Sequence, residues 1–141
     1  MGVWIGVDFD GTLVEYHSYN GIGTIGKSIM PMVRRVKRWL DRGIEVRIVT
    51  ARVNHIPSVV KREVAGIEKW CLETFGIILP ITCSKDFEMI ELWDDRAVPI
   101  STNTGRILSC DELNRMRNYE RSFSYVDSKN DLKKIKEDNS E

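Results

Sequence analysis

Two aspartates near the N-terminus, Asp8 and Asp10, have the residue type and spacing for chemistry on a phosphate or a metal ion. They directly follow the mainly apolar run at residues 3–7. In an extended chain, residues two apart point to the same side, so the two carboxylates should converge. Two carboxylates held next to each other repel unless a cation or a proton lies between them. Gly11, which follows, permits a tight turn or the close approach of a ligand. Alone, the motif fits a catalytic site and a capped turn after a strand about equally well.

A second acidic pair, Asp94 and Asp95, follows another apolar run at residues 89–93. One such pair after a strand is ordinary and could be a turn or a helix N-cap, with Arg96 as an internal ion-pair partner. Two pairs at the same edge of a sheet are unusual. Hard oxygen ligands gathered in this way favour Mg²⁺, which keeps several waters and takes phosphate oxygens as further ligands.

The elements that would position these residues alternate along the chain. Apolar runs bounded by turn residues predict strands, and apolar positions at helical spacing predict helices with Pro31 and Ser58 near their starts and Gly43 and Gly76 at their ends. The expected strands are residues 3–7, 44–49, 77–82, 89–93 and 97–100, and the expected helices are residues 31–42, 58–75 and 109–121.

This alternation predicts an α/β fold, a Rossmann-like three-layer sandwich with a mainly parallel sheet of about five strands. In such sheets ligands bind beyond the carboxyl ends of the strands. The polar residues that fall at or just after those ends are Asp8, Asp10, Thr50, Lys85, Asp94 and Asp95.

The chain should form one domain over residues 1–121. Its Gly-rich residues 14–30 lack periodicity and predict a loop or flap. Residues 122–141 are polar and charged, with few core-forming side chains, and predict a loosely held tail.

The composition of the chain argues against several classes of function. Lys plus Arg equals Asp plus Glu at 21 each among the 141 residues, which gives no support for nucleic-acid binding by bulk electrostatics. The three cysteines, Cys71, Cys83 and Cys110, share no metal-ligand spacing and suit reduced thiols. No apolar run approaches the ~20 residues that cross a bilayer, and the N-terminus carries no secretory leader pattern. We therefore expect a cytoplasmic protein without a membrane partner.

The ordered set of motifs resembles a known family. Asp8-Phe9-Asp10-Gly11-Thr12, a strand ending in Thr50, then Lys85, then a strand ending in Asp94-Asp95 is similar to the four motifs of the haloacid dehalogenase-like (HAD) superfamily of phosphatases. The likeness covers residues 3–100. The segments 48–52 and 93–96 also resemble small uncharacterised phosphatase-like proteins of bacteria and phages.

The resemblance implies a mechanism. Asp8 would attack phosphorus and form an aspartyl-phosphate intermediate, and Asp10 would act as general acid and then as general base. Thr50 would donate a hydrogen bond to a phosphoryl oxygen, and Lys85 would neutralise charge during transfer. Substrate would also lie against the two loops, at Gly11, Thr12, Ala51 and Arg52.

The resemblance also implies a magnesium site. Mg²⁺ would be held by the Asp8 carboxylate, the Asp10 backbone carbonyl and the last acidic motif, with Asp95 as direct ligand and Asp94 nearby or bound through water. One feature departs from the family pattern. Only residues 86–93 separate Lys85 from Asp94, where the family has a helical crossover, so Arg52 or Arg96 could supply the positive charge instead.

Neither interval between the motifs is long enough for a cap domain. An open site would admit a polynucleotide phosphate end, or it would borrow a lid from a second subunit of a homo-oligomer. In the second case a small phosphate ester such as a nucleotide or sugar phosphate is a plausible substrate. The sequence does not decide between the two.

Two other functions stay open. Residues Gly21–Ser28 match the phosphate-binding loop of nucleoside triphosphatases letter for letter. That loop requires a buried strand before it and a helix that starts at its Lys-Ser pair. Residues 15–20 make a poor strand, and Pro31 favours a later helix start, so a flap in which Lys27 contacts substrate is the preferred interpretation. The third possibility is a non-catalytic phosphate-binding domain of the same fold.

Overall fold

The computed structural model describes residues 2–117, and within them the chain divides into two compact units. Residues Trp4–Asp95 form one unit. Of the remaining described residues, 2–3 and 96–117 form the other. Each unit is described by itself below. The expected tail, residues 122–141, lies outside the described residues and stays a prediction.

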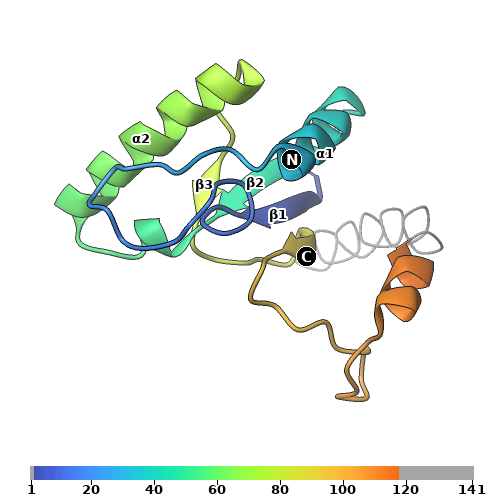
Figure 1. The fold of residues 1–141 in the computed structure, drawn as a ribbon. Helices are drawn as coiled ribbons and strands as arrows, with labels where there is room; N and C mark the ends of the chain where they lie inside the picture. Colours follow the sequence, from blue (N-terminus) through green and yellow to red (C-terminus); the bar gives the residue numbers. More distant parts are fainter. Residues whose placement is uncertain (1, 118–141) are drawn as a thin grey trace, which may run out of the picture. The chain divides into compact units, whose positions relative to one another are not determined.

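The first unit is built on a parallel sheet whose strand order is β3-β2-β1-β4 (Figure 1). All three strand pairs are parallel, so all the carboxyl ends meet at one edge. This confirms the Rossmann-like α/β prediction, with four strands in the sheet instead of about five. The strands are β1 (Trp4–Asp8), β2 (Glu45–Val49), β3 (Ile81–Thr82) and β4 (Met89–Trp93).

Two helices connect the first three strands, α1 (Met30–Asp41) and α2 (Pro57–Phe75). Each has a proline in its first turn, where the missing N–H costs no helical hydrogen bond. Gly76 ends α2 in the left-handed conformation with φ 74°, and its N–H donates to the Leu72 carbonyl. The predicted helices thus form within one residue of their expected starts.

The core lies between the helices and one face of the sheet. Val46 and Ile48 alternate with more exposed residues along β2, as expected when one strand face is buried. Side chains of both helices join them in a single cluster, in which Phe9 meets Trp70 edge-on at a centroid distance of 5.1 Å. Since α1 and α2 both contribute to this cluster, both cover the same face.

Two strand predictions need correction. Residues 97–100 do not form a fifth strand of the sheet, because among the described residues they make only an isolated bridge from Ile100 to Ile107. Val98 and Ile100 are 62% and 47% exposed, so this segment lacks the burial of a central parallel strand. The strand expected at residues 77–82 shortens to two residues, since Pro80 has no N–H to donate to a neighbouring strand.

The pairing of β1 with β4 contains a register shift. Trp4 is level with Met89, but Ile5 is level with Glu91, so β4 carries one extra residue. Beyond this bulge the register is regular, and Val7 is level with Trp93.

The predicted flap is a loop closed at its base. Val14 bridges Ser28, and the Glu15 N–H donates to the Lys27 carbonyl at 2.8 Å. The segment between these residues contains no helix or strand. The flap therefore leaves the sheet and returns to it at nearly the same point, directly after the Asp8–Thr12 turn.

The second unit contains a helix over its described residues 110–117, in line with the expected helix at 109–121. Ser109 precedes it, and its Oγ accepts a hydrogen bond from the Glu112 N–H at 3.1 Å. Glu112 also pairs with Arg106 at 2.8 Å. Within residues 2–117, no helix has the length and apolar character needed to span a bilayer.

Candidate functional site

The candidate site lies at the carboxyl edge of the parallel sheet. Asp8 is the last residue of β1, Thr50 follows β2, and Asp94 and Asp95 follow β4. Because β1 is paired with both β2 and β4, these residues come from neighbouring strands. The sequence prediction of a polar cluster at this edge is confirmed for the acidic residues of β1 and β4.

Three carboxylates form the centre of the site. Asp8, Asp94 and Asp95 each offer an oxygen atom, and these atoms lie within 4.8 Å of one another. Asp8 and Asp94 are half-buried, and Asp95 is exposed. Negative groups this close repel one another, and a bound cation would relieve that repulsion.

The Thr12 hydroxyl joins the two strands across the cluster. Its Oγ1 donates to Asp8 Oδ2 at 3.1 Å and accepts from the Asp95 backbone N–H at 3.2 Å. Gly11 makes the turn between them with φ +86°, and a Cβ at this position would lie 2.5 Å from Asp95 Oδ2. Glycine is therefore required here both for the backbone conformation and for the space beside Asp95.

Burial and the neighbouring acidic groups both affect the protonation of Asp8. Burial raises the pKa of Asp8 from 3.8 to about 7, and the nearby Asp94 charge and a hydrogen bond with Asp95 add to the increase. The Thr12 hydroxyl opposes this because it stabilises the ionised form. Without a cation, Asp8 holds a proton at a pH where an ordinary aspartate is ionised.

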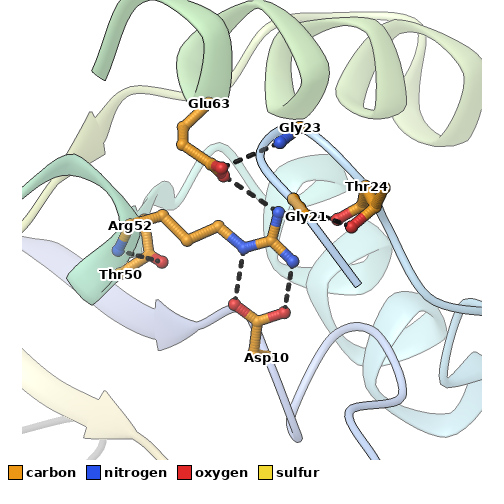
Figure 2. A network of polar contacts seen from close by, with 7 residues as sticks. All are labelled: Asp10, Gly21, Gly23, Thr24, Thr50, Arg52 and Glu63. Carbon is orange, nitrogen blue, oxygen red and sulfur yellow. Dashed lines mark hydrogen bonds and ion pairs between the residues drawn. The ribbon is translucent and has the colours of Figure 1, made fainter. Parts of the chain in front are cut away.

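The Asp10 carboxylate does not join this cluster. Its two oxygens accept hydrogen bonds from Nε and Nη2 of Arg52, both at 2.7 Å (Figure 2). We expected Asp8, Asp10, Asp94 and Asp95 to gather their four side chains, and the structure brings together three of them. The Arg52 guanidinium binds the Asp10 carboxylate instead, through two parallel charge-assisted hydrogen bonds that hold this carboxylate away from the other three.

Arg52 has a second acidic partner, Glu63 of α2. Nη1 of Arg52 lies 3.0 Å from Glu63 Oε2 and 2.7 Å from the Thr24 carbonyl of the flap. Glu63 Oε1 accepts a hydrogen bond from the Gly23 N–H at 2.8 Å. Figure 2 shows the guanidinium between Asp10 and Glu63, with the flap beside it. Hydrogen bonding to Asp10, more than any other cause, raises the pKa of Arg52 above its ordinary value.

The remaining predicted residues differ in how closely they join the site. Thr50 is buried, and its hydroxyl accepts a hydrogen bond from the Arg52 N–H at 3.2 Å as the cap of the 3₁₀ turn η1 (Ala51–Val53). Ala51 is exposed at the start of that turn. Lys85 is exposed in the loop between β3 and β4, which is a short connection without a helix, as its length predicted.

The phosphate-binding-loop motif at Gly21–Ser28 lies within the flap. Residues 15–20 before it form no strand, and α1 begins at Met30, after the Lys-Ser pair. A working loop of that class needs both elements to aim its N–H groups at a phosphate. Its glycines instead bring the flap backbone close to Glu63 and to Gly66 of α2.

Glu63 is the residue of this network that the sequence analysis missed. A signal was present, because Glu63 precedes Ile67 by four positions and so lies on the inward side of α2, where the other buried residues are apolar or tryptophan. A carboxylate at such a position needs a buried partner. In the structure this partner is Arg52.

The donor set fits a hard divalent cation. Three carboxylates at one edge provide oxygen ligands, and burial together with the neighbouring Asp94 charge raises the pKa of Asp8. Mg²⁺ is commonly bound by one or two carboxylates, waters and a substrate phosphate. The residues present are therefore suited to such an ion.

No protein-family model matches the chain, and no curated protein matches it. Among solved structures, it is similar to a conserved protein coded by a locus of Bacteroides thetaiotaomicron, with 20% sequence identity and a TM-score of 0.48. The similarity covers 89% of this chain and 98% of that one.

Proposed function

We propose that this protein is a Mg²⁺-dependent phosphomonoester hydrolase of the HAD-like superfamily that acts through an aspartyl-phosphate intermediate. The observation that carries the proposal is the convergence of Asp8, Asp94 and Asp95 within 4.8 Å at the carboxyl edge of the sheet. The motif order in the sequence supports it. Three free cysteines, two of them exposed, support a location in the reducing cytoplasm.

Asp8 is the proposed nucleophile. One of its carboxylate oxygens attacks phosphorus, a new O–P bond forms, and the bond from phosphorus to the leaving oxygen breaks. Thr12 supports this role, since its hydroxyl binds Asp8 Oδ2 and fixes the orientation of the carboxylate. Thr50 is held at the end of the neighbouring strand, where its hydroxyl would bind a phosphoryl oxygen.

Asp10 is the proposed acid/base. It gives its proton to the leaving oxygen in the first step. In the second step it accepts a proton from the water that attacks phosphorus, and the bond from phosphorus to Asp8 breaks. Since Arg52 occupies both Asp10 oxygens, at least one of these hydrogen bonds must open for either transfer.

The residues that would hold Mg²⁺ are Asp8, Asp94 and Asp95 through their side chains and Asp10 through its backbone carbonyl. When bound, the ion would screen the charge between the attacking carboxylate and the phosphate. Arg52 is already committed to two acids, so we keep Lys85 in the loop before β4 as the proposed cation for the phosphoryl group. Arg96 stays the alternative.

The proposed substrate is a phosphate monoester. Residues Trp4–Asp95 contain no additional domain between their motifs, and the only long insertion is the flap. This arrangement supports either a polynucleotide phosphate end or a small ester, such as a nucleotide, enclosed with the help of a second copy of the chain.

The test is phosphate release from p-nitrophenyl phosphate, phosphorylated metabolites, and oligonucleotides with 3′- or 5′-phosphates. We expect activity that requires Mg²⁺ and falls at least ~100-fold in Asp8→Asn. Asp41→Asn makes the same change at an exposed position at the end of α1 and should keep full activity. Binding of Mg²⁺ and phosphate without turnover of any substrate would refute the hydrolase and favour a non-catalytic domain. ATP binding that is lost in Lys27→Ala and unaffected in Asp8→Asn would instead favour the phosphate-binding-loop function.

A further inference from the structure

Glu63 occupies an unusual position for a carboxylate. It lies in the middle of α2, and the residue is only 4% exposed. Each of its oxygens has one partner, the Gly23 N–H of the flap for Oε1 and Arg52 for Oε2. A buried carboxylate is stable only when its charge is paired and its oxygens are hydrogen-bonded. The network satisfies this requirement by joining the helix, the flap and Arg52.

Arg52 connects Glu63 to Asp10. Its Nη1 binds Glu63 and the Thr24 carbonyl, while Nε and Nη2 bind Asp10. The guanidinium is planar and rigid, so fixing one edge of it also fixes the direction of the other. The Arg52 side chain is 18% exposed, so water does little to screen these contacts.

We infer that Glu63 is a positioning residue that acts through Arg52, holding the flap segment Gly21–Thr24 and the Asp10 carboxylate as one unit. Opening of the flap and release of Asp10 are then coupled, because each breaks hydrogen bonds made by the same guanidinium. The part of this inference that concerns catalysis rests on the proposed function. The coupling itself does not.

The first experiment measures the coupling without metal or substrate. The Arg52 Nε–H and the Gly23 N–H are followed by ¹H–¹⁵N NMR, and their exchange with water is compared among variants. In Glu63→Gln, which keeps the size of the side chain, we expect both to exchange about ten-fold faster than in the wild type. Glu73→Gln is the matched control, since it breaks only an exposed ion pair with Lys69 on the same helix.

The second experiment compares two leaving groups. p-Nitrophenolate leaves without a proton, whereas an alkoxide needs one from the general acid. If Asp10 is poorly positioned in Glu63→Gln, kcat for an alkyl phosphate should fall about 100-fold and kcat for p-nitrophenyl phosphate less than about three-fold. A purely structural role for Glu63 would lower both by the same factor.

Each outcome decides a separate point. Unchanged exchange of the two N–H groups in Glu63→Gln overturns the coupling, whatever the activity. Faster exchange with an unchanged ratio of alkyl to aryl turnover overturns the positioning of Asp10. If the wild type hydrolyses nothing, the proposed function fails, and the exchange rates alone decide the coupling. Should Glu63→Gln fail to fold, Arg52→Lys keeps the charge but loses the two-pronged contact with Asp10. It should give faster exchange of the Gly23 N–H and the same selective loss of alkyl phosphate turnover, and the absence of both would overturn the inference.

Discussion

Proton and metal should compete for Asp8, and the structure sets the size of the effect. With a pKa of about 7 in the metal-free protein, about nine-tenths of Asp8 is protonated at pH 6 and about one-tenth at pH 8. A metal ion must displace this proton to bind the carboxylate. The Kd for Mg²⁺ should therefore be about ten-fold tighter at pH 8 than at pH 6.

Isothermal titration calorimetry in two buffers with different protonation enthalpies measures both quantities. We expect about 0.9 protons released per Mg²⁺ at pH 6 and about 0.1 at pH 8. An affinity that is the same at both pH values, or a proton release that does not change, would contradict the assignment of Asp8 as a ligand with a raised pKa.

Asp94→Asn tests whether the Asp94 charge contributes to the raised pKa of Asp8. Two carboxylates with oxygens within 4.8 Å repel by ~1 kcal/mol in water-like surroundings, which corresponds to about 0.7 of a unit in the pKa of Asp8. The ten-fold change in Kd between pH 6 and pH 8 should then shrink to about three-fold, independently of any loss of overall affinity. Asp41→Asn should keep the ten-fold change. A ten-fold change that survives in Asp94→Asn would show that the Asp94 charge does not act on Asp8.

Three further predictions concern stability. Because folded Asp8 binds its proton more tightly than the unfolded chain does, the metal-free protein should lose stability as the pH rises from about 4 to 7, and thermal melts of Asp8→Asn should lack this loss. Thr12→Val removes the hydroxyl that joins Asp8 to the Asp95 N–H, so urea titration should show a loss of about 1–3 kcal/mol, and an unchanged midpoint would refute the contact. Gly11→Ala forces a Cβ against Asp95 at a positive φ and should cost at least ~1 kcal/mol and weaken Mg²⁺ binding measured by calorimetry.

The parts of the site that lie at strand ends could be predicted from the sequence. Asp8 and Asp94 each follow an apolar run of β1 or β4, and parallel pairing then brings them to one edge. The position of the Asp10 side chain could not be predicted this way. It depends on Arg52, three residues past the end of β2, and on Glu63 in α2, so three separate segments must fold before the ion pairs exist.

The strand predictions failed where burial, and not the pattern of apolar residues, decides whether a segment joins the sheet. Ile77 and Ile78 have high strand propensity, but in the structure each remains about half exposed, and only the last two residues of the expected strand pair with β2. Similarly, Val98 and Ile100 alternate with other residues as in a strand, yet no neighbouring strand pairs with them in the four-stranded sheet. Local sequence does not specify which apolar runs obtain a place in the sheet.

The bulge between β1 and β4 sets which residues of the two strands stand opposite each other. With the extra residue, Val7 is level with Trp93, so the next residues along, Asp8 and Asp94, stand side by side. If the register of Trp4 and Met89 continued without the bulge, Trp93 would be level with Asp8, and Asp94 would lie one residue beyond it. A local irregularity of the backbone at the start of β4 therefore decides which of its residues stands beside Asp8.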